Sequence, residues 1–238
     1  MLRLDKMLAD AGWGTRNEVR QAIRTGRVRV DGDPVSDPAR KVDPSACAVL
    51  MDGQEIGYRA HDYLMMHKPA GVVSATEDPR EPTVIDLLPP PYRRRGLFPA
   101  GRLDKDATGL LVLTNDGALA HRITAPGRRV PRVYRVEVDG PLSPADAEAF
   151  AAGMTLPGGE VCLSAELCQI PGEEGKTAQV TLCEGKYHQI KRMFAARGHT
   201  VLALKRLSHG ALRLDETLRP GEWRPLSEAE RAALDGLR

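Results

Sequence analysis

The residues best suited to chemistry stand in a loop bounded by two glycines, Gly101 and Gly109. Within this loop Arg102 and Asp104 are two positions apart, shortly before the apolar run Leu110–Thr114. Side chains at the entrance to a buried strand can point into a cleft, where a carboxylate could act as a base or a nucleophile. The same spacing also suits a surface ion pair that steadies a turn, and on spacing alone this simpler interpretation is favoured.

Motifs for other kinds of chemistry are missing from the sequence. The stretch GEEGKT at 172–177 lacks the first glycine of a phosphate-binding loop, because Ile170 stands there, and a hairpin turn is the better interpretation. No GxGxxG or GxSxG stretch occurs, and the histidines lack the HxxxH spacing of zinc hydrolases. The four cysteines form no CxxC pair. We therefore expect no metal and no cofactor, with reduced thiols in a cytoplasmic protein.

The elements that must position this loop follow from the hydrophobic pattern. Leu110–Thr114 predicts a buried strand that ends at the turn Asn115–Gly117, and the apolar run from Tyr63 predicts an earlier strand. The proline-rich sequence between 79 and 91 predicts a loop and a short helix. Further strands are expected at 133–138, 161–167 and 178–182, and helices at 143–152, 188–197 and from Ser227.

The first segment predicts a compact module of about 55 residues. Apolar residues between 4 and 11 form one helical stripe, and Thr15 with Glu18 forms a capping box that opens a second helix. Strands are expected at 27–30, on a returning segment that carries Val35 and Val42, and at 47–51.

Many strands joined by hairpins, with helices interspersed rather than strictly alternating, favour an α+β fold with a mostly antiparallel mixed sheet. The polar stretch 53–61 is the expected linker. We therefore expect two domains, a small N-terminal α/β module over 1–58 and a larger domain over 59–238.

Basic residues are concentrated in three segments, although the net charge is only +2. Residues 1–30 carry seven Lys or Arg against three acids, whereas 117–136 carry five Arg and 186–206 carry six Lys or Arg, both without an acid. This distribution suggests a positive face for phosphates, although solvated surface charge explains it equally well. No apolar run reaches the roughly 20 residues that span a bilayer, and the start of the chain lacks a signal-peptide pattern. We expect no membrane segment.

Six stretches carry a more specific pattern: LMMHKPAG (64–71), PAGRLD (99–104), GLLVLTNDG (109–117), VYRV (133–136), EGKYHQIKRMF (184–194) and LRPGEWRPL (218–226). In this order they resemble the pseudouridine synthases of the small-subunit ribosomal synthase A family. The first segment resembles the RNA-binding module named after ribosomal small-subunit protein four, which this family carries at its N-terminus. The resemblance covers nearly the whole chain, and it makes 59–238 a catalytic domain.

The resemblance implies roles for four residues. Asp104 matches the catalytic aspartate, which would attack the sugar or act as a base that starts elimination. Tyr134 matches the tyrosine that stacks on the target base, and Arg102 a residue that fills the space left by the flipped base. Lys191 matches the cation that pairs with the aspartate and favours its charged form. Asp106, in the same loop, receives no role.

The implied activity is isomerisation of a specific uridine to pseudouridine in ribosomal RNA, with 16S rRNA of the small subunit favoured over 23S rRNA. The implied partner is ribosomal RNA or a pre-ribosomal particle, bound by a cytoplasmic monomer that needs no cofactor. A non-catalytic ribosome-assembly protein is the alternative from another class. It would be expected to lose Asp104 or Tyr134, and both are present. Without the resemblance, Tyr134 is better interpreted as a core aromatic and Lys191 as a phosphate contact.

Overall fold

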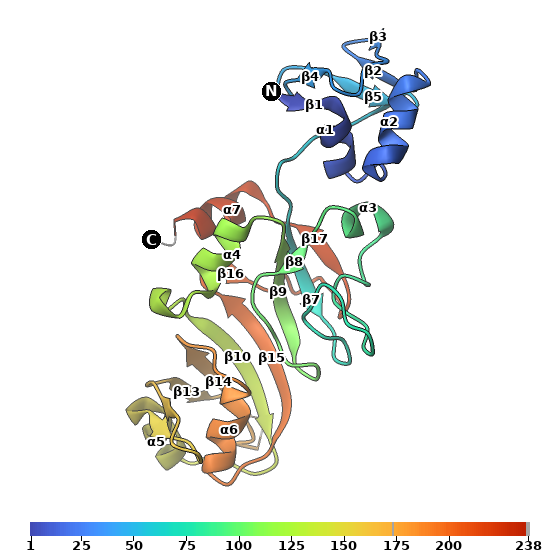
Figure 1. Cartoon of the computed structure of the whole chain (residues 1–238). Coiled ribbons are helices and arrows are strands. Elements are labelled where there is room, and N and C mark those ends of the chain that lie inside the picture. The colour runs from blue at the N-terminus through green and yellow to red at the C-terminus, as the bar shows by residue number, and fades with distance from the viewer. Residues whose placement is uncertain (173, 237–238) are drawn as a thin grey trace. The chain divides into compact units, whose positions relative to one another are not determined.

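The computed structural model describes residues 1–172 and 174–236, which form two compact units (Figure 1). One unit comprises Met1–Asp62 with Ile85–Leu97, and the other comprises Tyr63–Val84 with the described residues from Phe98 to 236. The proline-rich segment 85–97, with its short helix α3 (Pro90–Arg93), groups with the N-terminal unit. Domains at 1–58 and 59–238 remain a prediction.

The N-terminal unit packs two helices against small strands. Helices α1 (Leu4–Asp10) and α2 (Arg16–Arg24) bury the apolar stripes expected of them, and Thr15 forms the predicted capping box with Glu18. The four-stranded sheet has the order β3 (Asp33–Pro34), β2 (Val28–Val30), β5 (Val49–Met51) and β6 (Gln54–Glu55).

Two expectations for this unit were wrong in detail. Val42 does not lie on the strand that returns from β2, because β4 (Lys41–Val42) pairs instead with β1 (Leu2–Arg3). The expected linker starts later than Gly53, because Gln54 and Glu55 pair with β5 and the next residue, Ile56, is buried. The apolar residue Ile56, directly after the polar Gln54 and Glu55, was the sequence feature that indicated a strand here and was overlooked.

The second unit is built on a nine-stranded mixed sheet, which confirms the predicted α+β class. Its strands pair antiparallel except for the central pair, where β9 (Thr108–Thr114) and β15 (Val201–His209) run parallel. The path of the sheet is β13 (Glu166–Gln169), β14 (Thr177–Leu182), β10 (Arg132–Val138), β15, β9, β7 (Tyr63–Lys68) and β17 (Trp223–Pro225), with β8 (Phe98–Pro99) and β16 (Leu212–Arg213) at the side.

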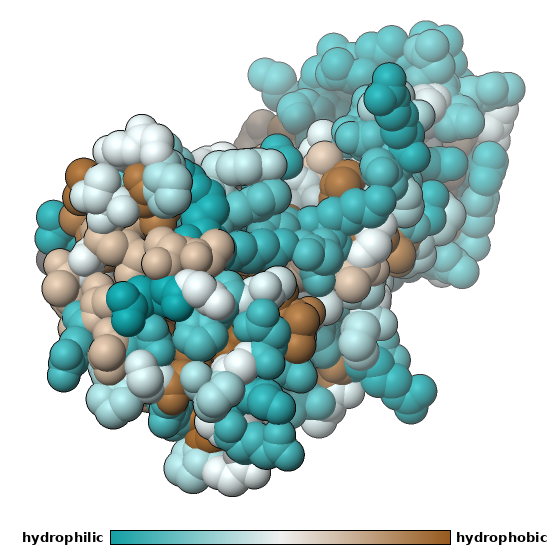
Figure 2. Space-filling view, turned by 90° about the horizontal axis from the view of Figure 1, so that it is seen from below, coloured by the Kyte–Doolittle hydropathy of each residue, from teal (hydrophilic) through white to brown (hydrophobic). Residues whose placement is uncertain are grey.

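Helices cover the two ends of this sheet separately (Figure 1). At one end α4 (Gly117–Thr124) and α7 (Glu228–Asp235) join a core with β7 and β9. At the other end α5 (Pro144–Ala152) and α6 (Gln189–Ala196) cover β10 and β14, and the rings of Phe150 and Phe194 lie 4.9 Å apart. The end that carries α5 and α6 has hydrophobic residues interspersed among hydrophilic ones on its surface (Figure 2). Smaller elements are a 3-10 helix at Pro126–Arg128 and the hairpin of β11 (Met154–Thr155) with β12 (Val161–Cys162).

The parallel pair β9 and β15 approaches so closely that one position must be glycine. Gly109 has φ +104°, and a Cβ atom there would lie 2.2 Å from the backbone oxygen of Arg206. Gly109 and Arg206 are register partners across the two strands. The loop that carries Asp104 is therefore fastened directly to β15.

The structure departs from the predicted elements of the second unit in several places, and the short strands β8, β11, β16 and β17 are among the elements that were not expected. Strand β15 and helix α4 were not expected, because both lie in segments interpreted as basic surface. The single strand expected at 161–167 is divided between β12 and β13. The hairpin expected at 172–177 joins β13 to β14, but Glu173 of its turn lies outside the described residues. Within the described ranges no helix is long and apolar enough to cross a membrane.

Candidate active site

The loop between β8 and β9 holds Asp104 through backbone contacts that start at a buried lysine. Lys68, at the end of β7, is fully buried and donates hydrogen bonds to the carbonyl oxygens of Lys105 (3.2 Å) and Ala107 (2.8 Å). The hydroxyl of Ser74 donates to the carbonyl of Leu103 at 2.9 Å. These donors fix the backbone on both sides of Asp104, so its carboxylate has a defined place.

Keeping Lys68 in its charged form costs free energy, because its side chain is fully buried. Burial lowers the pKa of Lys68 to about 8, and the negative charges of Asp106 and Asp104 oppose this shift. A desolvated ammonium group has lost its hydration, so the carbonyl oxygens that accept its hydrogen bonds must stabilise its charge. Lys68 therefore acts as a structural anchor of the loop, and sequence reasoning assigned it no part in the site.

Lys191, on α6, contacts both aspartates of the loop. Its Nζ atom lies 3.5 Å from Oδ2 of Asp104, so the expected ion pair forms, but it lies closer to the carboxylate oxygens of Asp106, at 2.6 and 2.7 Å. The hydrogen bond from Lys191 lowers the pKa of Asp106, while partial burial opposes this shift. Burial tends to lower the pKa of Lys191, but the two carboxylates outweigh it and raise that pKa. Asp106 thus shares the cation that sequence reasoning gave to Asp104 alone.

His188 is a second basic group beside Asp104, and it was missed in the sequence. It precedes α6 in the left-handed conformation, with φ +48°, and its Nε2 atom lies 3.6 Å from Oδ1 of Asp104. Its ring stacks on that of Tyr187, with centroids 3.9 Å apart. Because Tyr187 is 76% exposed, this aromatic pair borders the site on its solvent side.

All four residues predicted for the site line one cavity of about 440 Å³. Asp104 and the exposed Arg102 come from the β8–β9 loop, Lys191 comes from α6, and Tyr134 comes from β10. The Tyr134 side chain is nearly buried, as its alternative interpretation as a core aromatic would also require. Arg206 of β15, which sequence reasoning did not select, lines the same cavity.

The cavity combines a carboxylate at its mouth, an aromatic ring deeper inside and basic groups around both. This arrangement can receive a flat, neutral ring and leave the group attached to that ring beside the carboxylate. Within the described part of the chain, no cluster of three or more His, Cys, Asp or Glu side chains could hold a metal ion.

Comparison with known proteins gives the family to which this site belongs. The model of the RNA pseudouridylate synthase family matches residues 62–196, and that of the S4 domain matches residues 2–46. The chain therefore belongs to the RNA pseudouridine synthases, which are isomerases.

Relatives that match over nearly their full length show which members of this family the chain is similar to. The chain is 43% identical over 234 residues to the ribosomal small subunit pseudouridine synthase A of Vibrio cholerae, covering 98% of this chain and 99% of that one. It is 46% identical over 230 residues to an uncharacterized RNA pseudouridine synthase, YtzG, of Bacillus subtilis, covering 96% of each. A crystal structure of a pseudouridylate synthase, 35% identical, matches with a TM-score of 0.69 over 98% of this chain and all of that one. The resemblance found in the sequence is confirmed.

Proposed function

We propose that this enzyme converts a specific uridine of small-subunit ribosomal RNA into pseudouridine, with Asp104 as its catalytic carboxylate. The observation that carries the proposal is the single cavity shared by Asp104, Tyr134 and Lys191, three residues from separate parts of the chain. The small-subunit target is supported by relatives that match over their full length, such as the ribosomal small subunit pseudouridine synthase A of Vibrio cholerae.

The reaction breaks the bond between N1 of uracil and C1′ of the ribose, turns the base over, and joins C1′ to C5. The proton on C5 is lost and N1 takes up a proton, so atoms balance without a cofactor. Asp104 acts at the sugar, either as the nucleophile that attacks C1′ or as the base that starts an elimination. The ammonium group of Lys191 offsets negative charge that appears beside Asp104 during these steps, and the nearby ring of His188 can donate a hydrogen bond there.

The base itself enters the deeper part of the cavity. Tyr134 offers a flat apolar face against which uracil stacks, and Arg102, on the exposed loop, occupies the place that the flipped base leaves in the RNA. Flipping a base out of its stack costs a few kcal/mol, which contacts elsewhere must offset. The basic segments 117–136 and 186–206 contribute both to the cavity and to the surface around it.

The N-terminal module, residues 1–58, provides a second region that recognises structured RNA. Its S4 domain match supports this role. Arg16 and Arg24 are exposed on α2, whereas Arg20 and Arg27 bond to Asp5 and Asp52. The first two therefore supply the RNA contacts of this helix.

We also propose that the enzyme works in the cytoplasm, as a monomer and without a cofactor. The reaction as written needs no redox or group-transfer agent, and Asp104, Tyr134 and Lys191 of this one protomer already line a single cavity that can receive the target base. The four cysteines are free thiols, as the reducing cytoplasm would keep them.

The test is a map of pseudouridines in ribosomal RNA from cells with and without the gene. One site of the small-subunit RNA should disappear without the gene and return with the natural protein. An Asp104→Asn protein should not restore it, although it keeps the size and hydrogen-bonding groups of the side chain. A lost site in large-subunit RNA would overturn the proposed target, and restoration by Asp104→Asn would remove Asp104 from its role.

A further inference from the structure

Arg206 is the most deeply buried cation that lines the cavity. Its exposed fraction is 1%, and its Nε atom donates to the backbone oxygen of Leu110 at 2.7 Å. Its Nη2 atom, also buried, has no hydrogen-bond partner in the described part of the chain. A buried guanidinium with an unused donor costs free energy, so a fold that retains one has a reason outside its own packing.

The charges around Arg206 do not supply that reason. Among the described residues no carboxylate forms an ion pair with Arg206. Its charge acts instead on Lys68, Arg132 and His209, and in each case it lowers the pKa of that neighbour, in addition to the larger effect of burial. Arg206 thus stands among basic groups, in an environment that favours an acceptor from outside the protein.

The position of Arg206 shows which part of an RNA it can meet. Tyr134 and Arg206 are directly opposite on the neighbouring strands β10 and β15, and both side chains line the cavity. The side chain of Asp104 is 27% exposed, and Tyr187 at the rim is 76% exposed. A nucleotide whose ribose lies at Asp104 therefore keeps its phosphates near the rim and places its base beside Tyr134 and Arg206.

We propose that Arg206 recognises the target base by donating a hydrogen bond from Nη2 to a carbonyl oxygen of uracil. This inference rests on the function proposed above, and it adds a residue that selects the base. Uracil carries acceptors at O2 and O4, whereas cytosine carries an amino donor at C4. A donor placed at O4 thus binds uracil and meets a second donor in cytosine, which leaves both groups unpaired.

The same contact suits a base that must turn over. Exchanging N1 for C5 at the sugar requires a half-turn of uracil about its N3–C6 axis, and this half-turn also exchanges O4 with O2. A donor that binds one carbonyl before the turn therefore finds the other carbonyl in the same place afterwards. Arg206 accordingly holds the detached base in register and binds substrate and product alike.

The test replaces the acceptor and the donor in turn. Substrate RNAs carry uridine, 4-thiouridine or 2-thiouridine at the target, because sulfur is a weaker acceptor than oxygen. Single-turnover rates are measured with the full-length enzyme, with Arg206→Met and with Arg206→Lys. Lys205→Met is the matched control, since Lys205 is the neighbour of Arg206 on β15 but does not line the cavity. Thermal unfolding establishes that each variant is folded.

We expect Arg206→Met to slow the conversion of uridine by roughly ten- to a hundredfold, the range for a buried hydrogen bond from a charged donor. At least one thio-substitution should slow the natural enzyme and Lys205→Met several-fold, and have little further effect in Arg206→Met. If Arg206→Met does not fold, Arg206→Lys, which keeps the cation but changes the donor geometry, should show a reduced sulfur effect.

An equal sulfur effect with and without Arg206 would overturn the inference. A methylphosphonate beside the target tests the competing role as a phosphate ligand. If that neutral linkage slows the natural enzyme but not Arg206→Met, Arg206 binds phosphate and the inference is wrong. These outcomes require that the natural enzyme forms pseudouridine in the unmodified RNA, so failure of the proposed function would be seen separately, as no product at all.

Discussion

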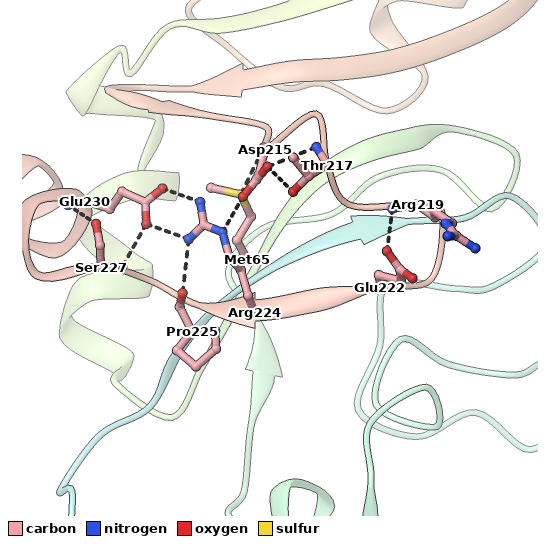
Figure 3. A network of polar contacts seen from close by, with 9 residues as sticks. All are labelled: Met65, Asp215, Thr217, Arg219, Glu222, Arg224, Pro225, Ser227 and Glu230. Atoms are coloured by element: carbon pink, nitrogen blue, oxygen red, sulfur yellow. Dashed lines mark hydrogen bonds and ion pairs between the residues drawn. The ribbon is translucent and has the colours of Figure 1, made fainter.

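Two arginines of the second unit show opposite ways of holding a cation. Arg224 on β17 donates from Nε to Asp215 at 2.6 Å and from both Nη atoms to Glu230 at 2.8 Å (Figure 3). Arg206 on β15 is more deeply buried, yet it bonds to one backbone oxygen and to no carboxylate among the described residues. The more exposed arginine is thus the better paired one.

This difference separates a structural cation from a binding cation. Arg224 ties the edge strand β17 to helix α7 and to the segment after β16, and the hydrogen bonds that it donates to Glu230 and Asp215 raise its own pKa. Arg206 lines a cavity and has a donor atom, Nη2, without a hydrogen-bond partner among the described residues, so the acceptor for this donor must come from a ligand. Lys191 lies between these two cases, because one of its two carboxylate partners, Asp104, lines the cavity, whereas the other, Asp106, does not.

Lys191 therefore gives the first and largest test of the comparison. Lys191→Met should lower the single-turnover rate roughly a hundredfold, because the loss of a charge beside the reacting carboxylate removes an interaction of about 2–3 kcal/mol. The unfolding midpoint in urea should change little. This result would class Lys191 with Arg206, as a cation that serves the reaction.

Asp106→Asn is the matched control for Lys191. It removes the carboxylate that is nearer to Lys191 Nζ and leaves Asp104 in place. We expect a rate within about fivefold of the natural enzyme, because the cation then serves Asp104 alone. A loss as large as that of Lys191→Met would show that Asp106 takes part in the reaction.

Arg224→Ala should act on stability and not on the reaction. It leaves Asp215 and Glu230 without their shared partner, and we expect a loss of roughly 1–3 kcal/mol in the free energy of unfolding by urea. Arg219→Ala, at an exposed arginine of the same segment (Figure 3), should change it by less than about 0.5 kcal/mol. A folded Arg224→Ala enzyme with a strongly reduced rate would contradict the division between the two arginines.

The Arg224 network should also be sensitive to acid. Hydrogen bonds from Thr217 and Arg224 lower the pKa of Asp215 to about 2, and those from Arg224 and Ser227 lower the pKa of Glu230 to about 2. A lowered pKa contributes stability above the unfolded value, near 4, and this stability is lost as the pH falls toward 2. The difference in urea midpoint between the natural protein and Arg224→Ala should therefore shrink from pH 6 to pH 2.5. A constant difference would assign the effect of Arg224 to packing.

Local sequence patterns, such as helix capping boxes and apolar runs, were sufficient to predict much of the fold. The capping boxes at Thr15 and Ser227 start helices as predicted, and the buried run Leu110–Thr114 lies within the central strand β9. In these places the residues that define an element are neighbours in the sequence. The family resemblance then supplied the four site residues, and the structure places them around one cavity.

What the sequence could not predict depends on contacts between distant segments. Arg206 lies in a run rich in lysine and arginine, and a charged residue at an inward position of β15 conceals the alternation with Leu204 and Ser208. Its importance follows from its pairing with Tyr134 and from the close approach of Gly109. His188 was overlooked for a similar reason, because only the start of α6 brings its ring to Asp104.

The arginines of α2 extend the same distinction to the N-terminal unit, with the smallest expected effect. Arg20 donates to the fully buried side chain of Asp5 at 2.9 Å, while Arg16 and Arg24 are exposed on the same helix. Arg16→Ala with Arg24→Ala should weaken binding of ribosomal RNA by roughly two- to tenfold at physiological salt, and reduce its salt dependence by about one to two counterions.

Arg20→Ala is the control for this pair, and it should behave like Arg224→Ala. It should cost roughly 1 kcal/mol of stability, because Arg3 still pairs with Asp5, and it should leave the salt dependence of binding unchanged. Filter binding across a salt series and urea unfolding measure the two effects separately. If Arg20→Ala weakened RNA binding more than the changes at Arg16 and Arg24 do, pairing with the buried carboxylate of Asp5 would not identify Arg20 as a structural cation.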